Sequence, residues 1–169
     1  LILLCLPFIG FGQDVVKSSD YFDELTAEEK RIIVNKGTEK AGTGFYNNHF
    51  DEGTYICKAC NNPLFKSNSK FRSDCGWPAF DDEIKGSISR YVDFSFGIKR
   101  IEICCSNCNG HLGHVFKGEE LTEKNIRHCV NSLSIKFINK YKQIYNEKNI
   151  TYITLCSCDW VWARKYKVF

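Results

Sequence analysis

The sequence predicts a mainly β fold of antiparallel β-sheets with a short N-terminal helix, clamped by a zinc ion. Short apolar–polar alternations separated by turn residues begin after residue 42. Between residues 50 and 140 no long stretch has the 3.6-residue period of a helix. Two C-x-x-C pairs, at 57–60 and 105–108, have the spacing of metal ligands. Together these features indicate a small β scaffold held by a metal.

Length and charge limit the function further. A chain of 169 residues fits one domain with tails, and such a domain can bury its own core without disulfides. The net charge is only +3, and the basic residues are scattered along the chain. Nucleic-acid binding needs a concentrated basic surface, so we expect no nucleic-acid partner. We expect a monomer.

The chain opens with the apolar stretch "LILLCLPFIGFGQD", which is too short to span a bilayer. It is similar to the hydrophobic part of a secretory signal peptide whose basic start is missing. We therefore expect residues 1–13 to be a signal-peptide remnant and the protein to be periplasmic or secreted. The alternative is an N-terminal apolar strand or helix in a cytoplasmic protein. Residues 14–24 are polar and read as a linker.

The stretch "LTAEEKRIIVNKGTEK" predicts the short helix. Thr26 and Glu29 have the S/T-x-x-E spacing of a capping box, in which each side chain bonds the other residue's backbone N–H. Leu25 precedes the cap and is placed to staple the entry of the helix. Gly37 is expected to end the helix.

Three stretches predict strands: "GTYICK" at 53–58, "GIKRIEICC" at 97–105 and "SLSIKFI" at 132–138. The second and third alternate apolar and polar residues, as a strand does when one face is buried and the other is wet. Arg100 and Glu102 are expected on the wet face of the second strand, and Ser134 and Lys136 on that of the third.

Residues 141–169 form a C-terminal extension of unknown role. The segment is rich in tyrosine, lysine and tryptophan but holds no motif. Cys156 and Cys158 are spaced C-x-C, which suits a single tetrahedral metal site poorly. An added strand or a tail is the simplest interpretation.

The paired cysteines predict one structural Zn²⁺ per chain, with the ligands Cys57, Cys60, Cys105 and Cys108. Each C-x-x-C turn lets two sulfurs reach one ion, and four protein ligands leave no open position for catalysis. Two alternatives stay open. The pairs could form disulfides in an oxidising compartment, or one pair could be a thioredoxin-type redox couple. Cys104 should point away from Cys105 on its strand and is excluded from the site.

Cys75 and Cys129 belong to no pair. Cys129 follows Arg127 and His128, and cationic neighbours lower the pKa of a thiol and make it nucleophilic. The stretch "HLGHVF" supplies His111 and His114 as metal ligands or proton donors. Because the zinc site already has four sulfurs, proton transfer is favoured. Each histidine alone could equally be a buried core residue.

The stretches "SDCGWPAF", "RIEICCSNCNGHLGHVF" and "RHCVNSLSIKF" occur in the order typical of the B-type methionine sulfoxide reductases. The chain resembles that family from about residue 25 to residue 140. The resemblance implies a catalytic domain over 25–140, mostly antiparallel β with a structural zinc. It also implies a set of site residues: Cys129 as nucleophile, Cys75 as recycling cysteine, Trp77 and Phe116 in substrate binding, and His111, His114 and Asn131 in catalysis.

The implied reaction explains these residue types. A thiolate attacks the sulfur of methionine-R-sulfoxide, free or in proteins, once the sulfoxide oxygen is protonated, and the oxygen ends on the enzyme as a sulfenic acid. A second thiol then forms a disulfide, which a thioredoxin-like reductant reopens. The expected role is protein repair under oxidative stress.

The chain departs from the family pattern after "HLGHVF". The stretch "KGEE" stands there, so an acidic residue expected near the site is absent and Lys117 occupies that point. Two other classes remain possible. One is a zinc-stabilised binding module without turnover, and the other is a general thiol–disulfide oxidoreductase. Trp77 could also be a plain core residue in a turn between Gly76 and Pro78.

Overall fold

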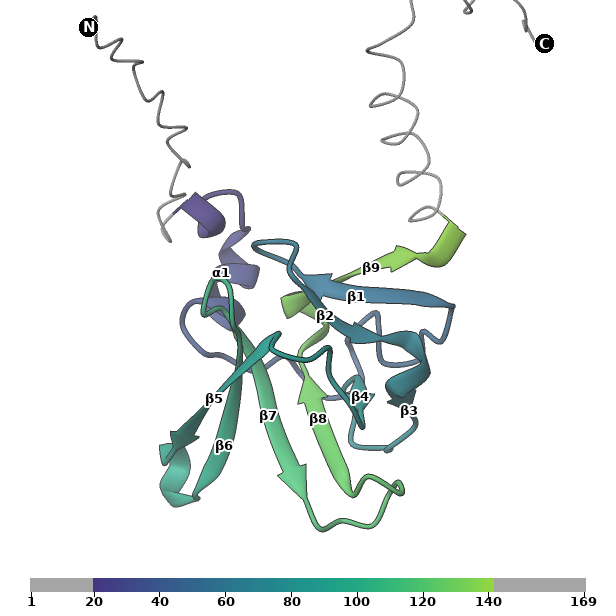
Figure 1. The fold of residues 1–169 in the computed structure, drawn as a ribbon. Helices are drawn as coiled ribbons and strands as arrows, with labels where there is room; N and C mark the ends of the chain where they lie inside the picture. Colours follow the sequence, from purple (N-terminus) through teal and green to yellow (C-terminus); the bar gives the residue numbers. More distant parts are fainter. Residues whose placement is uncertain (1–19, 142–169) are drawn as a thin grey trace, which may run out of the picture.

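The fold was analysed in a computed structural model that describes residues 20–141 (Figure 1). The expectations for residues 1–13, for Cys156 and Cys158 and for nearly all of the C-terminal extension lie outside the described residues. A 3-10 turn, η1 (Asp20–Phe22), lies within the segment read as a linker, and its Phe22 packs against the core. Among residues 20–141, no helix has both the length and the apolar character that a membrane span requires.

Two antiparallel sheets form the domain, as the sequence predicts. The smaller has the order β2-β1-β9, and the larger has the order β3-β4-β8-β7-β6-β5. In Figure 1 the strands of the smaller sheet cross above the long strands of the larger sheet. The bounds of the strands are β1 Gly53–Cys57, β2 Pro63–Lys66, β3 Lys70–Phe71, β4 Ala79–Phe80, β5 Ile88–Asp93, β6 Arg100–Cys105, β7 His111–Lys117, β8 Ile126–Val130 and β9 Ile135–Asn139.

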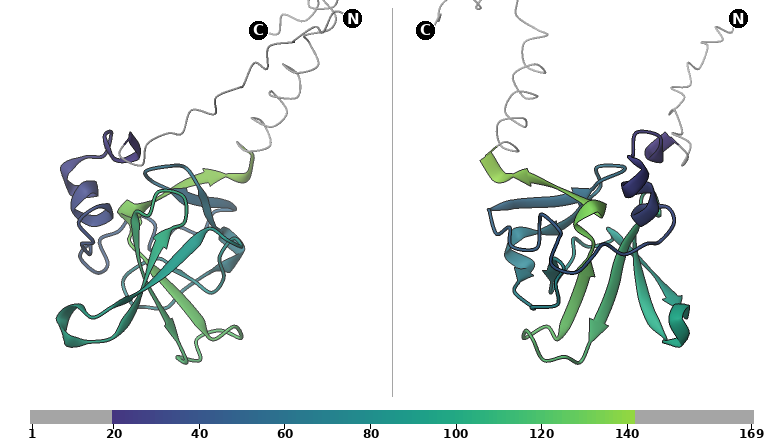
Figure 2. Two further views of the ribbon diagram at one scale, coloured as in Figure 1. Left: turned by 60° about the vertical axis from the view of Figure 1, so that its left-hand side comes forward. Right: turned by 180° about the vertical axis from the view of Figure 1, so that it is seen from behind.

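The helix α1 (Ala27–Ile33) begins at the predicted capping box. Thr26 Oγ1 accepts a hydrogen bond from the Glu29 N–H, and the Glu29 carboxylate accepts one from the Thr26 N–H. The helix ends at Ile33, however, before the predicted stop at Gly37. The chain turns at Lys36, which adopts a left-handed φ of 56°, and the Gly37 N–H then bonds back to the Arg31 carbonyl at 3.0 Å. The views in Figure 2 place α1 and the end of β9 at the same end of the molecule, opposite the β7–β8 turn.

The predicted wet faces of two strands are partly wrong. Glu102 on β6 is buried, because Lys36 and His111 both pair with its carboxylate. Residues Ser132–Ser134 form a 3-10 turn, η4, instead of the start of a strand, and Ser134 is fully buried. This turn is held by the buried Glu39 carboxylate, which accepts hydrogen bonds from the backbone N–H groups of Ser132 and Leu133.

Aromatic side chains join the two sheets in the core. Phe80 of β4 stacks on Phe65 of β2, with ring centroids 4.4 Å apart and planes 13° from parallel. Tyr55 of β1 meets the same Phe80 ring at 5.0 Å. All three side chains are 0% exposed, so the smaller sheet and the short strands of the larger one share a single packed layer.

This layer gives a test of the fold. Replacing Phe80 by Ala removes a ring that contacts both sheets, and we expect a loss of about 3–5 kcal/mol in the free energy of unfolding. Phe94→Ala is the matched control, because Phe94 is 68% exposed, and a change within about 0.5 kcal/mol is expected there. Urea unfolding followed by tryptophan fluorescence measures both. Equal losses in the two variants would contradict the packing described here.

Candidate functional site

One face of the larger sheet collects most of the chemically active side chains. In the strand register His114 lies opposite Cys129, Glu102 lies opposite His114, and Cys104 lies opposite His111. Directly opposite residues project to the same side of a sheet. The resulting surface, called the site face below, carries Asp93, Arg100, Glu102, Cys104, His111, His114, Phe116, Arg127 and Cys129.

His128 lies on the other face, which corrects its predicted role as a cationic neighbour of Cys129. His128 directly precedes Cys129 in β8, and neighbouring residues of a strand point to opposite faces of the sheet. Its Nδ1 bonds the Phe80 carbonyl at 3.0 Å, and its Nε2 lies 2.9 Å from the Glu83 carboxylate. His128 is 2% exposed and packs near Phe65 in the core. The sequence position of His128 next to Cys129 therefore led to a wrong prediction of a contact between the two side chains.

The two unpaired cysteines of the sequence meet on the site face. Cys129 projects from β8, and Cys75 comes from the loop before β4, with 3.8 Å between the two sulfurs. Gly76 shapes this loop with a φ of +91°, and its carbonyl accepts a hydrogen bond from the Gly42 N–H at 2.8 Å. The Ser73 hydroxyl also donates to the Cys75 sulfur at 3.0 Å. The geometry allows a disulfide to form after a small movement of the loop.

The contact between the two sulfurs shifts the pKa values of the two thiols in opposite directions. The hydrogen bond from Cys129, together with that from Ser73, lowers the pKa of Cys75 to about 5. The hydrogen bond with Cys75 and then burial raise the pKa of Cys129, although Arg127 acts to lower it. The low pKa predicted for Cys129 is thus found on its partner. Arg127 forms a salt bridge with Glu119, with 2.8 Å between Arg127 Nη2 and Glu119 Oε1.

A small pocket of about 110 Å³ opens beside Cys129. Trp77 lines it, and its Nε1–H donates to the Glu39 carbonyl at 3.1 Å. Asn131 lines it too, but its amide is engaged: Oδ1 accepts from the Glu39 N–H at 3.1 Å and Nδ2 donates to the Leu112 carbonyl at 3.2 Å. The other lining residues are Thr38, Arg100, Gly113, His114, Phe116, Cys129 and Val130.

Each histidine of "HLGHVF" pairs with its own carboxylate, a feature that the sequence did not reveal. His114 Nε2 lies 2.8 Å from Asp93 Oδ2, and His111 Nδ1 lies 2.7 Å from Glu102 Oε1. The two rings meet edge to face, with centroids 5.6 Å apart. Only His114 lines the Cys129 pocket. His111 is buried and faces an adjoining cleft of about 640 Å³, and this burial lowers its pKa.

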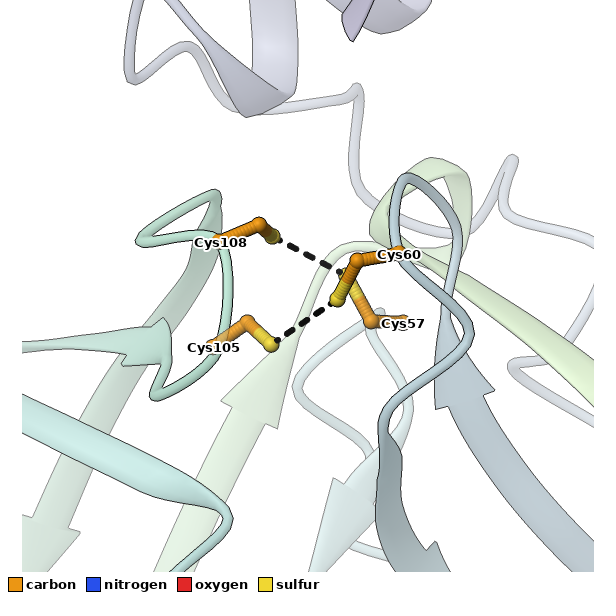
Figure 3. A group of neighbouring side chains, drawn as sticks. All are labelled: Cys57, Cys60, Cys105 and Cys108. Carbon is orange, nitrogen blue, oxygen red and sulfur yellow. Dashed lines mark hydrogen bonds between the residues drawn. The ribbon is translucent and has the colours of Figure 1, made fainter. Parts of the chain in front are cut away.

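The four paired cysteines converge between the ends of β1 and β6 (Figure 3). Their sulfurs all lie within 4.8 Å of one another, with 3.6 Å between Cys57 and Cys108 and 3.5 Å between Cys60 and Cys105. A tetrahedral zinc with bonds of about 2.3 Å would hold its sulfurs about 3.8 Å apart, so the four donors fit such an ion closely. The site therefore clamps the smaller sheet to the larger one.

The two cysteine turns share one backbone design. In each, an asparagine follows the second cysteine in a left-handed conformation, with φ values of 62° for Asn61 and 59° for Asn109. The N–H of each asparagine bonds the carbonyl of the first cysteine, at 3.0 and 2.8 Å. This repeat is visible in the sequence as C-x-x-C-N. All four sulfurs are free thiols at separations far above the roughly 2.05 Å of a disulfide, which disfavours that alternative.

The cysteine pair on the site face predicts a specific thiol reactivity. Iodoacetamide reacts with the thiolate, so its rate at Cys75 should fall only as the pH drops through the pKa of about 5. In Cys129→Ala the main hydrogen bond to that thiolate is gone, and the midpoint should move towards the ordinary value of about 8.5. Peptide mapping of Cys75 alkylation across pH 4–9 measures both. An unchanged midpoint in the variant would show that Cys129 does not hold the proton.

Comparison with known proteins adds a family. Residues 25–139 match the SelR domain. Peptide methionine sulfoxide reductase B2 of Arabidopsis thaliana, a chloroplastic protein, is 55% identical over 114 residues, or 67% of this chain and 55% of its own length. Peptide methionine sulfoxide reductase B5 of Oryza sativa subsp. japonica is 53% identical over 67% of this chain and 82% of its own length. An uncharacterized protein of Schizosaccharomyces pombe is 45% identical over 76% of this chain and 96% of its own length.

The coverage of these relatives differs, and the chain spans only about half the length of the chloroplastic one. Among solved structures, the Yippee-like domain of Mis18 superposes with a TM-score of 0.44 at 16% identity, over 53% of this chain and 97% of that one. This similarity is too limited to support an assignment of fold or function.

Proposed function

The chain belongs to the SelR-domain family, the family of the B-type peptide methionine sulfoxide reductases, and on that premise we propose that it reduces methionine-R-sulfoxide to methionine by thiol chemistry. The observation that carries the proposal is the pair of sulfurs, Cys75 and Cys129, 3.8 Å apart beside a pocket lined by Trp77 and His114. Repeated turnover through a sulfenic acid and a disulfide uses two such thiols, whereas a binding module has no use for them.

In the proposed first step the Cys129 thiolate attacks the sulfoxide sulfur. The S–O bond of the substrate breaks, a proton reaches the oxygen, and the products are a Cys129 sulfenic acid and the methionine thioether. Two electrons pass from the cysteine sulfur to the substrate sulfur. His114 lines the pocket directly opposite Cys129 and is placed to supply the proton.

In the proposed second step Cys75 resolves the sulfenic acid. Its sulfur bonds to that of Cys129, the hydroxyl leaves as water, and a disulfide remains. A thioredoxin-like dithiol then reduces this disulfide by exchange. The loop position of Cys75 supports this role, because Ser73 and the Gly76 turn already hold its sulfur against that of Cys129.

The pocket walls suggest how the substrate is held. The Trp77 ring offers a flat apolar surface for the S-methyl group, and Phe116 adds a second aromatic wall. Both Trp77 and Asn131 bond to Glu39, so we assign Asn131 a positioning role that keeps this wall in place. The buried set around Glu39 then fixes the pocket before substrate arrives.

We further propose that the four-cysteine site holds one structural zinc. Four thiolates at this separation repel one another unless a cation offsets their charge, and zinc accepts a tetrahedral set of sulfurs. Four protein ligands fill the coordination, so the ion would act on stability and leave the chemistry to Cys129.

The reaction is tested with separated R and S sulfoxides of a blocked methionine and a dithiol reductant. Turnover of the R form alone is expected from the wild-type protein. Cys129→Ser should lose at least about 10³-fold in kcat/KM, because an alcohol is a far weaker nucleophile than a thiolate. Near-wild-type turnover by Cys129→Ser, or no turnover by the wild type, would reject the proposed function.

Cys75→Ser separates the two steps. The first step should survive, so one methionine per chain should form and one sulfenic acid should be trapped by a dimedone probe. Thioredoxin-dependent turnover should stop, since the sulfenic acid has lost its resolving thiol. Cys104→Ser is the matched control, because Cys104 is buried and is expected to leave turnover intact. Sustained turnover with thioredoxin in Cys75→Ser would remove Cys75 from this role.

The metal proposal predicts one zinc per chain by elemental analysis. Replacing Cys60 by Ser should release the ion and lower the melting temperature, because the two sheets lose their clamp. Cys104→Ser again serves as control and should keep the zinc. Purified protein that contains no metal and carries disulfides within both C-x-x-C pairs would contradict the site.

A further inference from the structure

The site contains an acidic residue, Asp93, that comes from a different part of the chain than the family pattern predicts. The stretch after "HLGHVF" lacks the acid expected there and has Lys117 at that point. Asp93 lies at the end of β5, two strands away from β7 in the sheet. Its Oδ2 lies 2.8 Å from His114 Nε2. A carboxylate from a different strand therefore occupies the space beside the pocket histidine.

Asp93 is held firmly in this position. The Ser95 N–H bonds Oδ1 at 2.8 Å, the Ser95 hydroxyl bonds Oδ2 at 2.9 Å, and an Arg100 Nη donates to Oδ2 at 2.7 Å. These donors, the backbone N–H and hydroxyl of Ser95 first, keep the pKa of Asp93 well below its usual range. The carboxylate is thus charged and oriented before any substrate binds.

We propose that Asp93 is the positioning residue of the proton donor: it accepts the Nε2–H of His114 and so orients the ring at the pocket. The inference rests on the proposed function and deepens it. Because the carboxylate accepts the Nε2–H, the proton that reaches the sulfoxide oxygen leaves from Nδ1. The imidazolium becomes a neutral imidazole in the same step in which the S–O bond breaks. Asp93 touches neither substrate nor thiol in this scheme.

The neighbouring pair, Glu102 with His111, provides the internal comparison. The Glu102 carboxylate is shared with Lys36, whose Nζ lies 2.8 Å away. His111 is 2% exposed and does not line the Cys129 pocket. A similar carboxylate–imidazole contact, also with a basic partner on its carboxylate, therefore exists at a ring that does not line the Cys129 pocket.

The charged and titratable groups around His114 come from every neighbouring element. They are Asp93 on β5, Arg100 and Glu102 on β6, His111 on β7, Cys129 on β8 and Lys36 in the loop after α1. Asp93 has the direct contact with the His114 ring nitrogen. Removing its charge should therefore affect the proton-donating step more than any other single neutralisation.

The test compares Asp93→Asn with Glu102→Gln, the same chemical change on each pair. Turnover of blocked methionine-R-sulfoxide with a dithiol reductant is followed as kcat from pH 5 to pH 10. Activity that needs a protonated acid falls on the alkaline side, and Asp93→Asn should move the midpoint of that fall to lower pH by about one unit or more. KM should stay roughly constant, and Glu102→Gln should leave the midpoint in place.

Folding is checked by melting temperature. Asparagine has the shape of aspartate and keeps the Ser95 contacts within reach. Asp93→Glu retains the charge and is the second variant, with the wild-type midpoint expected at a reduced kcat. An unmoved midpoint in Asp93→Asn, a shift only in Glu102→Gln, or equal shifts in both would overturn the role of Asp93. Loss of all wild-type turnover would instead reject the proposed function itself, so the two failures are distinguishable.

Discussion

The period-two alternation of the central strands is the constraint on which the site depends. β5 to β8 are paired without crossovers, so residues opposite one another share a face. A register shift in the β6–β7 pairing between Ile103 and Cys104 brings His111 to the same face as His114. One face packs Ile103, Val115 and Val130 into the core, while the other presents the histidines, their carboxylates and Cys129. A slip of one residue between β7 and β8 would send Cys129 into the core and bring His128 to the pocket.

The four-cysteine cluster and the charge pairs are placed to support this register. The four cysteines lie where β1 and β6 end, so a metal held by them would tie the smaller sheet to the larger one. On the site face, Asp93 and Glu102 each bond both a histidine and a basic side chain. The buried Glu102 carboxylate would destabilise the fold strongly without partners, and its contact with His111 also fixes that ring. Stability and preorganisation thus come from the same contacts.

Local features of the sequence predicted much of this fold. The capping box of Thr26 and Glu29, the cysteine pairs and the apolar–polar alternations depend on near neighbours, and the structure contains them all. Properties set by distant contacts were not accessible. Glu102 looked like a solvent-facing residue until Lys36, 66 positions away, paired with it. Similarly, the turn at Ser132–Ser134 depends on Glu39, and the partner of His114 comes from a strand 21 residues upstream.

The position of the shared proton links the two steps of the proposed reaction. In the resting pair the sulfurs lie 3.8 Å apart, and their contact lowers the pKa of Cys75 and raises that of Cys129, which favours the shared proton on Cys129. Moving that proton to Cys75 produces the Cys129 thiolate that attacks and leaves Cys75 as a thiol. When Cys75 later bonds to the sulfenic sulfur, the same proton leaves with the hydroxyl as water. One proton between two sulfurs therefore serves both steps, while His114 supplies the separate proton that the sulfoxide oxygen needs.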